Sequence, residues 1–307
     1  MKAKRLIVNA DDFGMSRGIT DGVLLAHRFG LVTSTSLMAN MPAAEYAATA
    51  GAKIPSLGIG VHLNICQGQP ILPASQIPSL VDVLGHFWRP AILAKKLWRG
   101  AVRTREIEAE FRAQIRWVKN CGIVPTHADS HQHMHLYPGA LQAFVRALSA
   151  EGIPCTRAPR CAVIPNNGVI GGPHEGGPAR RILVDCYRRF LQAVVLRRFQ
   201  MPLARLSFVS RERRDLALLG ASWLKTLSHL PPGTFELACH PGLFERGFSE
   251  TDRIRLQREE ELHWLTDSAM FHAVREAGIE LITYREIVEQ PVSRAAAART
   301  PALGGSA

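Results

Sequence analysis

The 307-residue sequence lacks any long hydrophobic run. No stretch of about 18 apolar residues free of charge is present, so the sequence predicts no membrane-spanning helix. The N-terminus starts with basic residues, but its apolar run lasts only a few residues before two aspartates, and it therefore predicts no signal peptide. We expect a cytoplasmic protein.

Cysteines are few and lie far apart in the sequence. There are six, and no two of them form a C-x-x-C motif. In a reducing compartment, such cysteines are expected to be free structural thiols and not disulfides. Cys239 stands beside His240, so a thiolate nucleophile at this position is an alternative.

Acidic residues are outnumbered by basic ones. The sequence has 37 Lys+Arg against 26 Asp+Glu, which gives a net charge of +11. An excess of basic over acidic residues favours nucleic acid, an anionic membrane or an anionic substrate as the partner. No recognisable nucleic-acid-binding module is present, so we expect no nucleic-acid partner.

Short apolar runs alternate with helical patterns along the chain. We expect strands at 5–9, 31–38, 57–63, 123–127, 234–240 and 279–284, and helices at 18–29, 43–50, 104–121, 141–148 and 252–275. This alternation predicts parallel strand pairing and an α/β fold. The sequence has no internal repeat and no Gly/Ser linker, so we expect one domain over 1–290. We expect insertions at about 76–103 and 160–230 and a disordered tail at 291–307.

Four of the predicted strands end in residues that can bind a metal: Asp11 with Asp12, His62, His127 and His240. Each has a structural explanation when taken alone, as a solvated carboxylate pair, a buried core histidine or a turn residue. In an α/β barrel, however, the carboxyl ends of the strands converge on one face, where active sites form. Four coincidences at one location favour a functional site.

The segment 127–135 is unusually rich in histidine, with four histidines and one aspartate. Neutral imidazoles are the commonest metal ligands, although a His-rich surface loop is an alternative. We expect the strand to fix His127 and Asp129 to accept the far N–H of a histidine. His131 and His133 are expected to line the mouth of the pocket.

Asp12, His62 and His127 together would form a two-histidine, one-carboxylate site. Such sites bind Zn²⁺, Fe²⁺ or Mn²⁺ and retain open positions, where a bound water becomes acidic and a substrate carbonyl is polarised. Asp11 is then placed to act as general base, and His240 to protonate a leaving nitrogen. This arrangement predicts amide hydrolysis; a non-haem iron oxygenase and a non-catalytic metal- or lipid-binding protein are the alternatives.

These residues lie in stretches that resemble the YdjC-like carbohydrate deacetylases. The matching stretches are 7–14, 60–64, 126–133 and 239–242. The resemblance implies a distorted (β/α) TIM-like barrel related to polysaccharide deacetylases. It also implies one divalent metal ion (zinc, magnesium or another transition metal) held by Asp12, His62 and His127, with Asp11 as base.

The activity implied by the resemblance is removal of the acetyl group from an N-acetylated amino sugar. Asn64, Asp129, His131 and His133 are then expected to bind substrate or to support the ligands. The sequence is also similar to the hopanoid biosynthesis-associated branch, which implies an N-acetylglucosaminyl hopanoid as substrate. A soluble chito-oligosaccharide is the alternative.

Two segments combine basic and aromatic residues. Ten arginines stand between Arg180 and Arg214, and the segment 83–103 mixes Trp and Phe with Lys and Arg. This composition is typical of helices that lie on anionic lipid, which predicts peripheral contact with the inner membrane face and a lipid-linked sugar substrate. An ordinary barrel helix with a solvated basic face is the alternative. The sequence leaves the oligomeric state open.

Overall fold

The computed structural model describes residues 3–161, 178–207, 227, 229–248, 252 and 254–289. The predicted tail at 291–307 lies outside the described residues, as does much of the predicted insertion at 160–230.

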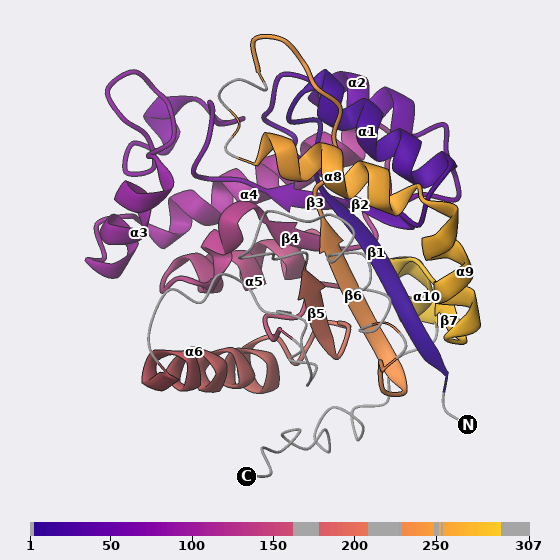
Figure 1. The fold of residues 1–307 in the computed structure, drawn as a ribbon. Coiled ribbons are helices and arrows are strands. Elements are labelled where there is room, and N and C mark those ends of the chain that lie inside the picture. Colours follow the sequence, from indigo (N-terminus) through magenta and orange to yellow (C-terminus); the bar gives the residue numbers. More distant parts are fainter. Residues whose placement is uncertain are drawn as a thin grey trace.

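A seven-stranded parallel sheet forms the centre of the molecule (Figure 1). The strand order is β4-β3-β2-β1-β6-β5, and β7 pairs with the first part of β1. The strands are β1 (Lys4–Phe13), β2 (Ser34–Leu37), β3 (Gly58–Leu63), β4 (Ala128–Ser130), β5 (Ala204–Ser207), β6 (Gly233–Cys239) and β7 (Ile279–Leu281). The predicted α/β class with parallel pairing is confirmed.

The two ends of this sheet are joined by the segment 155–161. Isolated parallel bridges connect Ala128 with Thr156 on one side, and Cys155 with Gln200 and Cys161 with Arg205 on the other. The segment therefore lies between β4 and β5. The strands form the predicted distorted barrel, in which single bridges replace regular ladders at the closure.

Helices surround the strands. They are α1 (Arg17–Arg28), α2 (Ala44–Gly51), α3 (Pro90–Trp98), α4 (Thr104–Asn120), α5 (Ala140–Ala150), α6 (Pro178–Phe190), α8 (Arg255–Leu265), α9 (Ser268–Glu276) and α10 (Tyr284–Glu289), with short turns η1 (Ala74–Gln76), η2 (His131–Leu136) and η3 (Leu191–Val195). Among the described residues, no helix has both the length and the hydrophobicity needed to cross a bilayer.

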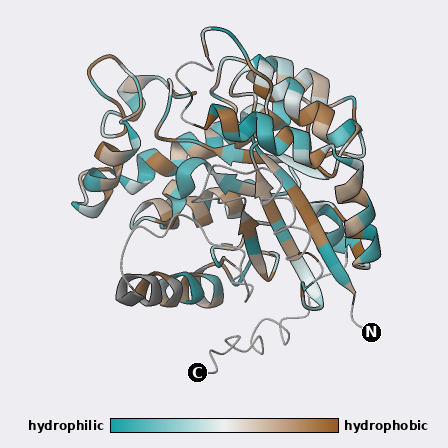
Figure 2. Ribbon diagram, viewed as in Figure 1, coloured by the Kyte–Doolittle hydropathy of each residue, from teal (hydrophilic) through white to brown (hydrophobic). Residues whose placement is uncertain are grey.

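The core follows the hydrophobic pattern of the sequence. In α4, the apolar stripe that includes Ile107, Phe111 and Ile115 is fully buried, as the 3.6-residue period predicts. Figure 2 shows hydrophobic colour along much of β1, β5 and β6, as expected for parallel strands covered on both faces.

Two predicted elements have different bounds in the structure. The strand predicted at 123–127 lies just before β4, which begins at Ala128, although backbone hydrogen bonds to β3 already start at Thr126. The expected helix 252–275 is divided into α8 and α9, because the side chain of Asp267 caps a new helix by accepting the Ala269 N–H.

Candidate active site

A β-bulge at the end of β1 brings both aspartates to the site. The pairing of β1 with β2 shifts between Ala10 and Phe13, and Asp12 has a φ of 66°. In a regular strand, consecutive side chains point to opposite faces, so Asp11 would point away from Asp12. The bulge changes this direction, so that carboxylate oxygens of both residues lie near His62.

Asp12, His62 and His131 form a buried group that can hold a metal ion. One ligand atom from each lies within 4.8 Å of the others. The Oδ1 atom of Asp12 is 3.5 Å from His62 Nε2 and 3.0 Å from His131 Nδ1. The donor set is the two-histidine, one-carboxylate set predicted from the sequence, with His131 in the place expected for His127.

Neighbouring side chains fix the orientation of each of these three residues. Asp129 Oδ1 lies 2.7 Å from His62 Nδ1, which leaves Nε2 directed towards Asp12. Arg258 Nη2 donates to Asp12 Oδ2 at 2.7 Å, and Gln67 Oε1 lies 3.0 Å from His131 Nε2. The partner on His62 is the carboxylate–histidine arrangement that orients metal ligands in proteins, and Asp129 has the position expected for it.

His127 is not part of this group among the described residues, and its role as a metal ligand stays a prediction. Its ring stacks on Tyr284 at a centroid distance of 3.8 Å, and its Nδ1 is 3.0 Å from Thr126 Oγ1. The strand-like pairing passes through this residue and ends at Ser130, so His131 is the first histidine beyond the strand end. Burial lowers the pKa of His127 to about 3, which makes it a neutral core residue.

Asp11 is held by a buried arginine. Arg157 Nη2 and Nη1 lie 2.5 and 2.7 Å from the two oxygens of Asp11, and Asn9 Nδ2 donates to Asp11 Oδ1 at 2.9 Å. The same guanidinium contacts Asp129 and Glu236, each at 2.8 Å. Three buried acidic side chains therefore share the guanidinium of Arg157. This one cation fixes the position of Asp11, the proposed base, and that of Asp129, which orients His62.

His240 follows β6 and lies at the edge of this network. Its Nε2 is 3.9 Å from Asp11 Oδ2, and its Nδ1 is 3.9 Å from Glu261 Oε2. Its side chain is 29% exposed, whereas the rings of His62 and His131 are nearly buried. His240 is thus the site histidine that is most accessible to a substrate entering from solvent.

The electrostatics favour ionised aspartates and a protonated His62. Burial raises the pKa of Asp11 and of Asp12, but the cations of Arg157 and Arg258 outweigh it and leave both pKa values lowered. Burial lowers the pKa of His62, but Asp129, with Asp11 and Asp12, outweighs burial and raises that pKa to about 9. In the absence of a metal, His62 therefore carries a proton in the space where a metal cation would bind.

Two further predicted residues have supporting positions. Asn64 donates to Gln67 O at 2.7 Å and accepts from Cys66 N–H, so it shapes the loop that brings Gln67 to His131. His133 has a φ of 55° and contacts Arg205, and both residues line a pocket that Arg157 also lines. The turn in η2 therefore separates His131 and His133, which we had expected to lie together.

Arginines and glutamates of the site escaped the sequence analysis: Arg157, Glu236, Arg258 and Glu261. Glu236 interrupts an apolar strand, which is the one local signal for a buried charged partner. Cys239, the alternative nucleophile, is buried and its thiol donates to Asn9 O. Burial raises the pKa of this thiol well above its usual value, so it is a structural thiol.

A parallel α/β barrel with buried acidic and histidine side chains at the carboxyl ends of its strands has the arrangement typical of barrel enzymes. The model of the family described as YdjC-like protein matches residues 5–276, and the chain belongs to this family.

Several relatives resemble the chain over most of its length. A carbohydrate deacetylase of Geobacillus stearothermophilus is 32% identical over 281 residues, which is 91% of this chain and 96% of the relative. A chitooligosaccharide deacetylase of Proteus mirabilis is 31% identical and covers 93% of this chain and 100% of its own length. A crystal structure from Enterococcus faecalis V583, whose name proposes cellobiose-phosphate cleavage, superposes with a TM-score of 0.74 at 26% identity, over 93% of this chain and 99% of that one.

Proposed function

We propose that this chain is a metal-dependent hydrolase that removes the acetyl group from an N-acetylated amino sugar. The observation that carries the proposal is the group formed by Asp12, His62 and His131, with Asp11 next to it. Relatives named carbohydrate deacetylase and chitooligosaccharide deacetylase support the reaction class. The parallel barrel speaks against the oxygenase alternative, because oxygenases with this ligand set usually have a jelly roll of short strands.

The three ligand residues fit a divalent cation by their chemistry. Each has one donor atom directed to the common space and its other polar atom occupied by Asp129, Arg258 or Gln67. Two imidazoles and one carboxylate suit zinc and related transition metals better than magnesium, which prefers oxygen ligands. When bound, such a cation polarises the amide carbonyl and makes water more acidic.

The protein's own residues would then move the protons of the hydrolysis. Asp11 is ionised and held in place by Arg157, so it can accept a proton from the attacking water. His240 lies 3.9 Å from Asp11 and is partly exposed, so it can deliver a proton to the nitrogen of the leaving amine. Water and the amide are consumed, and acetate and the free amine are formed.

Acetate release from N-acetylglucosamine oligomers by the metal-loaded protein tests this function. We expect Asp11→Asn to lower kcat by about 10²–10⁴-fold, the usual contribution of a general base, while metal content is retained. A wild-type protein that is metal-loaded but releases no acetate from any N-acetylated sugar contradicts the proposal. Retained activity in Asp11→Asn removes only Asp11 from the mechanism.

We further propose that the acetylated sugar is lipid-linked, as in an N-acetylglucosaminyl hopanoid, and that this cytoplasmic protein contacts the inner membrane face. Val83 and Leu84 are 100% and 75% exposed at the tip of a turn before α3, and Trp98 of α3 is 69% exposed. Leu183 and Phe190 of α6 are exposed as well.

Trp98 of α3 and Tyr187 of α6 both contact residues at the end of η2. Trp98 packs edge-on against Tyr137, and Tyr187 of α6 donates to the carbonyl of Leu136 at 2.8 Å. Lys95 and Arg99 of α3 are exposed beside Trp98, which adds the positive charge that anionic lipid attracts. Exposed apolar residues combined with basic ones support an interfacial surface.

Sedimentation with vesicles that contain anionic lipid tests the membrane contact. We expect binding at low salt that weakens in Leu84→Glu and falls with rising salt. A wild-type protein that stays in the supernatant at low salt contradicts the contact. In that case a soluble chito-oligosaccharide becomes the better substrate, and the deacetylase proposal is unaffected.

A further inference from the structure

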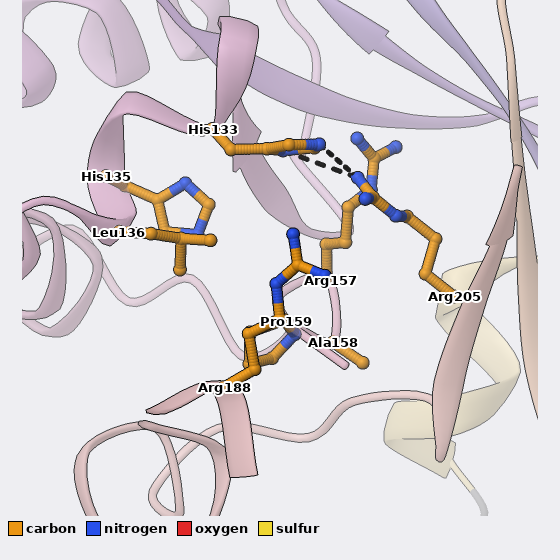
Figure 3. A pocket seen from close by; sticks show the side chains of 8 residues that line it. All are labelled: His133, His135, Leu136, Arg157, Ala158, Pro159, Arg188 and Arg205. Atoms are coloured by element: carbon orange, nitrogen blue, oxygen red, sulfur yellow. Dashed lines mark hydrogen bonds between the residues drawn. The ribbon is translucent and has the colours of Figure 1, made fainter. Parts of the chain in front are cut away.

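Arg157, which contacts Asp11 of the proposed active site, also lines a separate pocket (Figure 3). The pocket is lined by His133, His135, Leu136, Arg157, Ala158, Pro159, Arg188 and Arg205. The side chains come from η2, from the segment that closes the barrel, from α6 and from β5. Three guanidinium groups therefore border one space, and no carboxylate is among the described residues that line it.

The charge of Arg157 is balanced, but the charges of its two neighbours in the pocket are not. Arg157 contacts Asp11, Asp129 and Glu236. Within the described part of the chain, neither Arg188 nor Arg205 forms an ion pair with a carboxylate.

The polar partners of these two arginines are weak or neutral. Arg188 Nη1 and Arg205 Nη2 lie 3.5 and 3.4 Å from the sulfur of Cys161, and Arg205 also contacts His133. Sulfur is a weak acceptor, and a neutral imidazole carries no charge to balance a guanidinium.

Arg205 carries the argument, because it is only 6% exposed. Its Nε has no hydrogen-bond partner among the described residues. A buried guanidinium without a negative partner is strongly unfavourable, and buried charges in proteins are paired or bind a ligand. His135 adds a buried Nε2 that also has no partner among these residues. The pocket therefore presents donors and positive charge without an acceptor.

We propose that this pocket binds an oxyanion, a phosphate or a carboxylate group. Arginine forks match the geometry of both groups. The space, with its open mouth, is about 240 Å³. A single phosphate or carboxylate group is the occupant that these guanidinium donors match.

The pocket shares Arg157 with the active site, so the anion has two sources to be distinguished. It is either a substituent of the acetylated sugar or a free anion from solution. The first source rests on the deacetylase function proposed above, and the second does not.

Isothermal titration of the metal-loaded full-length protein with inorganic phosphate tests the site itself. We expect Arg205→Gln and the less buried Arg188→Gln each to weaken binding about tenfold or more, since each removes a charge-assisted contact. Arg198→Gln removes an exposed arginine that does not line the pocket, and it should bind phosphate as the wild type does. Urea unfolding of each variant identifies any loss that is due to misfolding.

Absence of phosphate binding by the wild type at millimolar concentrations overturns the proposal. Binding that is equal in the wild type, Arg205→Gln and Arg188→Gln also overturns it, because the phosphate would then lie elsewhere.

The ratio of kcat/KM for a 6-phosphorylated over a neutral N-acetylglucosamine oligomer separates the two sources. A preference for the phosphorylated sugar that falls about tenfold in Arg205→Gln, and persists in Arg198→Gln, identifies a substrate group. Phosphate binding without such a preference identifies a free anion. If neither sugar is deacetylated, the proposed function fails, while the titration still decides whether the pocket binds anions.

Discussion

Binding of the proposed cation is expected to release a proton from His62. Burial lowers the pKa of His62, but Asp129, with Asp11 and Asp12, outweighs burial and raises it to about 9. A metal ligand must be a neutral imidazole. Neutral pH lies about two units below this pKa, so displacing the proton costs about 3 kcal/mol, at 1.36 kcal/mol per unit. Metal affinity should therefore rise about tenfold per pH unit up to about pH 9.

Calorimetric titration of Zn²⁺ into chelator-treated protein measures this linkage. Buffers with different ionisation enthalpies should report about one proton released per ion at neutral pH. Asp129→Asn should lower the pKa of His62, reduce the number of protons released and weaken binding about 10–100-fold. Glu151→Gln, which removes a carboxylate paired with Arg112 and Arg116 on the outer helices, should leave the pH dependence unchanged.

An affinity that stays constant between about pH 7 and 9, without proton release, would refute this reasoning. The same pKa shift has a consequence for the metal-free fold. Because the pKa of His62 is higher in the folded than in the unfolded state, its contribution to stability is complete below about pH 6.5 and is lost as pH rises through about 9.

Three substitutions test other parts of the structure. His131→Ala should abolish stoichiometric metal binding, whereas His127→Ala should retain it, as measured by metal content after dialysis. Arg157→Ala leaves buried carboxylates unpaired and should lower the free energy of unfolding by about 3–5 kcal/mol in urea titrations. Gly60→Ala places a methyl group 2.4 Å from the His127 ring and should destabilise the protein by about 1–3 kcal/mol, measured in the same way.

Each of these substitutions has an outcome that would contradict the structure. Metal loss in His127→Ala together with retention in His131→Ala would restore the ligand set expected from the sequence. An unchanged unfolding free energy in Arg157→Ala would mean that this arginine does not hold the buried acids. Wild-type stability in Gly60→Ala would mean that His127 does not pack against this strand.

The barrel could be predicted because its signals are local. Apolar runs and helical periodicity lie within single segments, and the buried stripe of α4 is one example. The residues at the ends of β1, β3 and β6 could be found in the same way, because each polar residue directly follows an apolar run. These features required no knowledge of which strands pair.

The details of the site could not be predicted because they depend on contacts between distant segments. The choice between His127 and His131 depends on the register of β4 against β3, which is set by pairing across the sheet. The direction of Asp11 depends on a bulge that has no local sequence signal. Arg157 and Arg258 reach the aspartates from segments 146 and 246 residues away, and neither stands in a recognisable motif.

Anomalous scattering from crystals of the metal-loaded protein is the most direct test of the proposed centre. The account predicts one anomalous peak bonded to Asp12, His62 and His131, at about 2.0–2.2 Å from each ligand atom if the ion is zinc. A peak bonded to other residues, or no peak in crystals of protein that contains stoichiometric metal in solution, would contradict it.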